Sequence, residues 1–101
     1  MIKHIVLFKL ADEAEGKTRK ENALIIKEQL EALKDLIPEI HKIQVEINHQ
    51  DAVEDNYDII LDSEFKNLDD LNIYAIHPEH LKVGDYVKKV RVSRSAIDYE
   101  F

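Results

Sequence analysis

The residues best suited to chemistry gather in one stretch, Tyr74 to Tyr86, which reads YAIHPEHLKVGDY. Pro78 lacks a backbone N–H donor and disfavours helix at the preceding residue, so one helix should end at His77 and another should follow. Such a break would let Tyr74 and His80 point toward a common space. A neutral imidazole can remove a proton next to a carbonyl. A phenol can donate a hydrogen bond to the oxyanion that then develops, so this chemistry needs no metal or organic cofactor.

Each of these side chains also has a structural interpretation, which stays open at this point. Tyr74 could be a half-buried aromatic whose hydroxyl meets the backbone, and His80 could be a hydrogen-bonded core residue of a short helix. His77 is well placed to cap the helix that Pro78 begins. His77 and His80 could share a zinc ion at their i, i+3 spacing, but the sequence offers no evident third ligand and Pro78 interferes.

Composition and charge exclude several classes of protein. The 101 residues are 45% hydrophobic, which is typical of one globular domain spanning residues 1–101. With 14 basic and 21 acidic residues the net charge is −7, which argues against binding to nucleic acid or to anionic membranes. The absence of cysteine excludes disulfides and thiolate metal sites. No segment resembles a membrane span or a signal peptide, which predicts a cytoplasmic location.

Hydrophobic periodicity predicts four strands and two helices, the second of which is broken. A capping-box pair, Thr18 and Glu21, begins the first helix, and Pro38 ends it. The elements, in the order strand, helix, strand, strand, helix, strand, are residues 2–10, 18–37, 43–47, 57–65, 68–75 with 79–87, and 90–101. Leu24, Ile25 and Leu36 are expected to widen the buried stripe of the first helix. This α+β order is the ferredoxin-like βαββαβ pattern, a four-stranded antiparallel sheet with both helices on one face.

The first strand carries apolar side chains on both of its faces. Ile5 and Leu7 lie on the face opposite His4, and helices on one side of the sheet leave them uncovered. An uncovered apolar face favours a partner, so a two-fold homodimer with sheet against sheet is predicted. By default His4 is a hydrogen-bonded core histidine and Asp98 a solvent-exposed carboxylate. The short run of cations at Lys88, Lys89, Arg91 and Arg94 is expected to form a solvated strand end.

Four segments together resemble the stress-responsive dimeric α/β-barrel (Dabb) domain family. They are KHIVLFKL at the start, IPEI after the first helix, YAIHPEHLKVGDYV, and IDY near the end. The resemblance covers essentially the whole chain. It implies ferredoxin-like protomers whose sheets form a barrel across a dimer. The family includes plant olivetolic acid cyclase, a polyketide cyclase, and plant heat-stable stress proteins.

The resemblance also implies roles for particular residues. His80 and Tyr74 match the general base and the carbonyl-positioning donor of the cyclase. His4, His77 and Asp98 match groups that line or orient such a site. Some relatives hold a cation on backbone carbonyls at the end of the first helix, which would correspond to Lys34, Ile37 and Ile40. Water on those carbonyls is the ordinary alternative, and it is favoured here.

Three functional hypotheses follow from these observations. The first is an uncharacterised Dabb homodimer that binds a small apolar ligand in a pocket between sheet and helices. The second is a cofactor-free cyclase, isomerase or lyase that acts on a ketide-like or otherwise enolisable substrate through His80 and Tyr74. The third is an oligomerising stress protein that acts through its surface and has a filled core.

Overall fold

A four-stranded antiparallel sheet forms the frame of the chain, which the computed structural model describes from residue 1 to residue 101. Its strands are β1 (Ile2–Leu10), β4 (Lys42–Ile47), β5 (Ile59–Phe65) and β6 (Arg91–Glu100). The spatial order is β4-β5-β1-β6, so β1 pairs with β5 on one side and with β6 on the other. This order confirms the predicted ferredoxin-like α+β fold.

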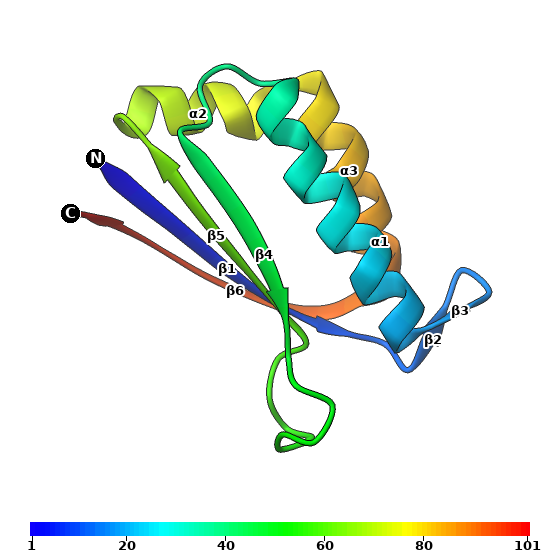
Figure 1. The fold of residues 1–101 in the computed structure, drawn as a ribbon. Coiled ribbons are helices and arrows are strands. Elements are labelled where there is room, and N and C mark those ends of the chain that lie inside the picture. Colours follow the sequence, from blue (N-terminus) through cyan, green and yellow to red (C-terminus); the bar gives the residue numbers. More distant parts are fainter.

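Three helices cover one face of the sheet and leave the other face bare (Figure 1). They are α1 (Arg19–Ala32), α2 (Leu68–Ile76) and α3 (Pro78–Val90), and a 3₁₀ turn (Leu33–Asp35) extends α1. The predicted capping box at the start of α1 is confirmed, because the Thr18 hydroxyl accepts from the Glu21 N–H and the Glu21 carboxylate accepts from the Thr18 N–H.

The hydrophobic core lies between the sheet and the helical layer. Val6 and Leu10 of β1 and Ile26 of α1 are almost fully buried there. Leu24 and Leu36, predicted to widen the buried stripe, are each 51% exposed. That prediction was wrong for Leu24, because one helical residue past Ala23 turns the side chain about 100° around the axis and out to solvent. It was also wrong for Leu36, which follows the 3₁₀ turn and lies outside the helix. Ile25 is half-buried.

The second helix breaks where the sequence predicts. His77 has an extended backbone with φ −63° and ψ 134°, and Pro78 occupies the first turn of α3. The second part is longer than the predicted residues 79–87, because α3 runs on to Val90. Val83, Val87 and Val90 continue the four-three spacing and are buried, so packing supports the extra turn.

A small hairpin precedes α1, between the first strand and the first helix that the sequence predicts. It consists of β2 (Glu13–Ala14) and β3 (Lys17–Thr18). Glu15 and Gly16 both have positive φ, 53° and 73°, which is the backbone that a two-residue hairpin turn of the primed type requires. Asp and Asn favour such turns more than Glu does, so the sequence carries only a weak signal for it.

The face of the sheet that the helices leave bare carries apolar side chains at its centre. Ile5 pairs with Ile97 and Leu7 pairs with Ile60 across this face. Ile97 is 61% exposed and Ile60 is 36% exposed, so both contact solvent in the single chain. The exposed centre fits the sequence-based expectation of an uncovered apolar face. None of the helices is long and apolar enough to cross a membrane.

Candidate functional site

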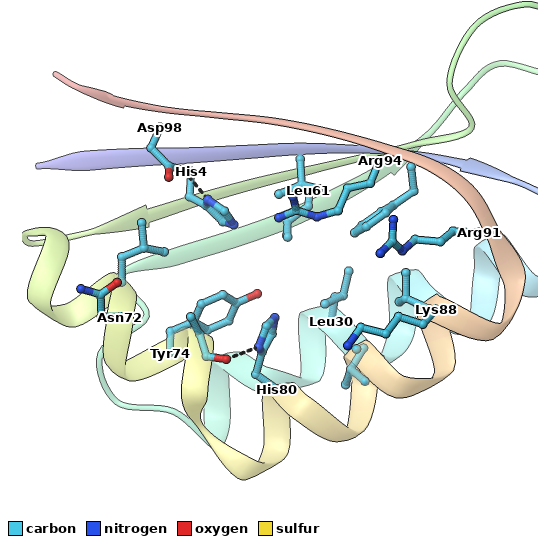
Figure 2. Close-up of a pocket in the computed structure, with 17 residues that line it drawn as sticks. His4, Leu30, Leu61, Asn72, Tyr74, His80, Lys88, Arg91, Arg94 and Asp98 are labelled. Atoms are coloured by element: carbon cyan, nitrogen blue, oxygen red, sulfur yellow. Dashed lines mark hydrogen bonds and ion pairs between the residues drawn. The ribbon is translucent and has the colours of Figure 1, made fainter.

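A cavity of about 300 Å³ lies between the sheet and the helices (Figure 2). This volume is at the small end of the range for ligand pockets. Its apolar lining comes from β1, β5 and all three helices: Val6, Phe8, Leu30, Leu61, Leu71, Ala75, Val83 and Val87. The filled core expected for a protein that acts only through its surface is therefore not what the fold contains. The polar lining consists of two groups of side chains: the first holds the tyrosine, two histidines, Asn72 and Asp98, and the second is a cluster of cations.

Tyr74 of α2 places a hydroxyl at the cavity without giving it a partner. The residue is 1% exposed, and its hydroxyl oxygen is buried and makes no hydrogen bond. In Figure 2 this hydroxyl points into the space between the sheet and α3. Burial raises the pKa of Tyr74 well above its ordinary value, and the charge of Arg94 opposes that rise. The phenol is therefore neutral and can donate a hydrogen bond.

His80 lies against Tyr74 because the break at Pro78 starts a new helix there. The two ring centroids are 4.3 Å apart. The Nδ1 of His80 is 3.0 Å from the Ala75 carbonyl oxygen, which can only accept, so Nδ1 carries the proton. Burial lowers the pKa of His80, although the bond to Ala75 opposes this shift. The neutral ring therefore keeps a free lone pair on Nε2, which is what a proton acceptor needs.

His4 and Asp98 form a second pair at the same cavity. They lie opposite each other on β1 and β6, and His4 Nδ1 is 2.5 Å from Asp98 Oδ1 (Figure 2). His4 also packs edge-on against Tyr74, with centroids 6.3 Å apart. Asp98 is solvent-exposed, as expected by default, with 43% of its side chain accessible, but the register also turns it toward His4, where the carboxylate accepts from Nδ1 and fixes the ring.

His77 is placed differently from the other histidines. Its Nδ1 accepts a hydrogen bond from the Glu79 N–H at 3.1 Å, and it is not among the residues that line the cavity. The structural alternative, a helix cap, describes this geometry. No group of three or more histidine, cysteine or carboxylate side chains is arranged to hold a metal ion.

The turn at Lys34, Ile37 and Ile40, where the resemblance suggested a cation on backbone carbonyls and water was favoured, does not line the cavity. The Ile37 carbonyl there accepts the Ile40 N–H at 3.2 Å. That carbonyl therefore already has a backbone partner, while its second lone pair stays available. The cation role of this turn stays a prediction.

The sequence reasoning missed the second polar group, the basic cluster formed by Lys88, Arg91 and Arg94. Lys88 and Arg94 are exposed and Arg91 is half-buried, as expected of a solvated strand end, but all three also line the cavity. A signal was present only in the spacing of Lys88 from His80. Lys88 lies in α3, two turns after His80, whereas Arg91 and Arg94 lie in β6 and are placed by the strand register.

Comparison with known proteins gives one consistent family. The model of the Stress Responsive A/B Barrel Domain family, Dabb, matches residues 2–101. The chain is 28% identical over 100 residues to the stress-response A/B barrel domain-containing protein DABB1 of Arabidopsis thaliana. That match covers 98% of this chain and 46% of the relative, so the chain spans about half the length of the curated relative it matches.

Solved structures show the same fold. A dimeric protein of unknown function with a ferredoxin-like fold from Bacteroides fragilis is 42% identical, with a TM-score of 0.82 and coverage of 99% of this chain and 95% of that one. A hydroxynitrile lyase from Passiflora edulis is 16% identical, with a TM-score of 0.76 and coverage of 97% and 90%. At that identity the likeness to the lyase concerns the fold alone.

Proposed function

Because the chain belongs to the stress-responsive A/B barrel (Dabb) domain family, we propose that it is a homodimer that binds a small carbonyl compound in the cavity between sheet and helices. The observation that carries this proposal is the buried Tyr74 hydroxyl with no partner. Leaving a buried hydroxyl unpaired costs about 1–3 kcal/mol. A ligand carbonyl inside the cavity would accept its hydrogen bond and remove that cost.

Gly84 gives independent support for a ligand in the cavity. It lies inside α3, where glycine destabilises a helix by about 1 kcal/mol relative to alanine. A Cβ added there would meet nothing within 4 Å, so neighbouring atoms do not require glycine. Gly84 lines the cavity, and a side chain would project into it. The glycine therefore keeps ligand space at a cost in helix stability.

The homodimer part of the proposal rests on the bare face of the sheet. Ile97 and Ile60 expose apolar surface at its centre, and the 42% identical relative from Bacteroides fragilis is described as dimeric. A second copy placed sheet against sheet would cover this apolar surface in both protomers at once. The cytoplasmic location predicted from the sequence stays a prediction.

Light scattering at micromolar concentration tests the dimer. The protein should have the mass of two chains, and Ile97→Lys should have the mass of one chain, because an unpaired charge would be buried at the interface. Leu24→Lys is the control, since Leu24 is 51% exposed on α1, away from the bare face. A single-chain mass for the unmodified protein would overturn the homodimer.

Ligand binding is tested with cyclohexanone as the probe. Its carbonyl should shift the NMR signals of residues around Tyr74 and His80, and Tyr74→Phe should bind it about tenfold more weakly because one hydrogen bond is lost. Cyclohexane, which has no carbonyl, should bind both proteins equally. Equal affinity of the two proteins for cyclohexanone would contradict the role of the hydroxyl.

A second candidate function is cofactor-free enolisation in the same cavity. It is favoured by the position of His80, whose free Nε2 lies beside the Tyr74 hydroxyl. Nε2 would take a proton from the carbon next to the carbonyl, the C–H pair would form a C=C bond, and Tyr74 would donate to the resulting oxyanion. Return of the proton to another position gives isomerisation, and attack by the enolate on a second carbonyl gives cyclisation.

Exchange of the α-protons of cyclohexanone in deuterium oxide tests this chemistry. The unmodified protein should accelerate the exchange, and His80→Gln should abolish the acceleration while its melting temperature and dimer mass stay unchanged. His41→Gln, at an exposed histidine outside the cavity, serves as the control. Exchange by His80→Gln at the unmodified rate would exclude His80 as the base.

A further inference from the structure

Three cations converge on the cavity from the end of α3 and the start of β6. They are the basic cluster, Lys88, Arg91 and Arg94, and Figure 2 shows their side chains reaching toward the space between sheet and helices. Arg94 lies opposite Phe8 in the sheet register, so it projects from the face that the helices cover. The register shift between Lys9 and Leu10 pairs Arg91 with Leu10, which returns Arg91 to the same face.

None of these three cations has a carboxylate partner. The ion pairs of the chain, within 4.0 Å, involve other basic side chains: Lys3, His4, Arg19, Lys27, Lys42 and Lys82. The protein has 21 acidic residues against 14 basic ones, so carboxylates are in excess. Because all three unpaired cations line the same cavity, an anionic group bound there would be attracted by each of them.

The carboxylate of Asp98 does not serve as that anion. It also lines the cavity, but it is engaged with the His4 ring at 2.5 Å. The positive charge of Arg94 also acts on His80 and Tyr74. It contributes to the lowering of the pKa of His80, and it opposes the rise in the pKa of Tyr74 that burial causes. The cavity therefore has a hydrogen-bonding end at Tyr74, an apolar middle, and a positively charged end.

We propose that the basic cluster is an anion-binding subsite, and that the ligand is an amphipathic carbonyl compound with a carboxylate or phosphate group. This proposal rests on the proposed function, because it assigns the ligand to the same cavity. The anionic group lies between Lys88, Arg91 and Arg94, where guanidinium groups can bind it with two hydrogen bonds each. The apolar body contacts Leu30, Leu61 and Val87.

Binding of octanoate, octyl phosphate and octanol to the dimer tests the proposal, because these probes share an apolar chain and differ in charge. Calorimetry gives the affinities, and NMR shifts at the basic cluster locate the bound chain. The unmodified protein should bind octanoate or octyl phosphate at least about tenfold more tightly than octanol. The anion that binds more tightly identifies the anionic group of the ligand as a carboxylate or a phosphate.

The triple variant Lys88→Gln, Arg91→Gln, Arg94→Gln should lose the preference for the anions and keep its affinity for octanol. Lys89→Gln is the matched control, since Lys89 is in the same helical turn and does not line the cavity. A higher salt concentration should weaken the binding of octanoate and octyl phosphate and leave the binding of octanol unchanged.

Two results would overturn the anion subsite, and they differ in what they imply for the proposed function. Equal affinity of octanol and octanoate, or a preference that survives in the triple variant, would leave a neutral ligand pocket and remove only the subsite. No binding of any probe at the cavity would remove the subsite and the ligand-binding function together.

Discussion

Two tyrosine hydroxyls in the helical layer have opposite environments. The Tyr86 hydroxyl donates to Asn22 Oδ1 at 2.5 Å, and the fully buried Asn22 donates from Nδ2 to the Ala14 carbonyl at 3.1 Å. The Tyr74 hydroxyl is more deeply buried than that of the half-buried Tyr86, yet it has no partner. The chain thus pairs its buried polar groups where they hold the hairpin, α1 and α3 together, and leaves one unpaired only beside the cavity. An unpaired buried hydroxyl requires an explanation, and the explanation proposed for Tyr74 is a ligand in the cavity.

The largest expected effect is at the paired cluster. Asn22→Ala removes two hydrogen bonds and leaves the Tyr86 hydroxyl and the Ala14 carbonyl without this partner. The free energy of unfolding should therefore fall by about 3 kcal/mol. Urea denaturation measures this. Asn22 does not line the cavity, so the folded variant should bind cyclohexanone normally. A loss below about 0.5 kcal/mol would mean that the cluster is not architectural.

Tyr86→Phe tests the same cluster with a smaller change. It removes only a hydroxyl and leaves Asn22 Oδ1 without a donor, so a loss of about 2 kcal/mol is expected. Combining this variant with Asn22→Ala in a double-mutant cycle should give a loss smaller than the sum, because the two residues share one hydrogen bond. Additive losses would contradict the coupling.

Gly84→Ala sharpens the comparison from the side of the cavity. The free energy of unfolding should rise by about 1 kcal/mol, since alanine is the better helix former and the new methyl meets no atom within 4 Å. Cyclohexanone binding should weaken because the methyl occupies ligand space. Asp85→Ala, at the exposed neighbouring position, should leave binding unchanged. A more stable variant with undiminished affinity would show that Gly84 does not preserve ligand space.

The smallest expected effect is electrostatic. Burial lowers the pKa of His80 below the ordinary value of 6.5, and Arg94 contributes to the shift in the same direction. Arg94→Gln should therefore raise the pKa of His80, measured by NMR titration of the ring, while Lys89→Gln should not. An unchanged titration in Arg94→Gln would place the guanidinium outside the electrostatic range of the His80 ring.

The same shift predicts how stability depends on pH. Folded His80 holds its proton less tightly than the unfolded chain does, so its contribution to stability is present above pH 6.5 and is lost as pH falls below that value. The loss of stability on acidification should be smaller in Arg94→Gln, because the pKa of His80 is then less depressed. A stability that rises on acidification through this range would contradict the sign of the shift.

The sequence predicts the frame of this molecule because the frame depends on local patterns. Alternating residues in β1, the capping pair at Thr18 and Glu21, and the helix break at Pro78 each act within a few residues, and all three are confirmed. The hairpin was missed because its turn uses Glu15 at positive φ, a residue with weak preference for that backbone.

The site is predicted only in part, because its composition depends on register and on long-range packing. His80 and Tyr74 are neighbours across the break, so their meeting follows from local structure. The inward orientation of Asp98 depends on which residue of β1 it faces, which periodicity alone does not determine. Placing Arg94 at the cavity depends on the same register, and placing Arg91 there depends also on the register shift between Lys9 and Leu10.

The most direct test of the central claim is the stability of Tyr74→Phe without ligand, measured by urea denaturation beside Tyr86→Phe. If the Tyr74 hydroxyl is unpaired and kept for a ligand, removing it should leave the free energy of unfolding unchanged or raise it by about 1 kcal/mol. Tyr86→Phe should be destabilised in the same experiment. A loss in Tyr74→Phe as large as that in Tyr86→Phe would show that the hydroxyl has a structural partner, and would contradict the assignment of the cavity as a ligand site.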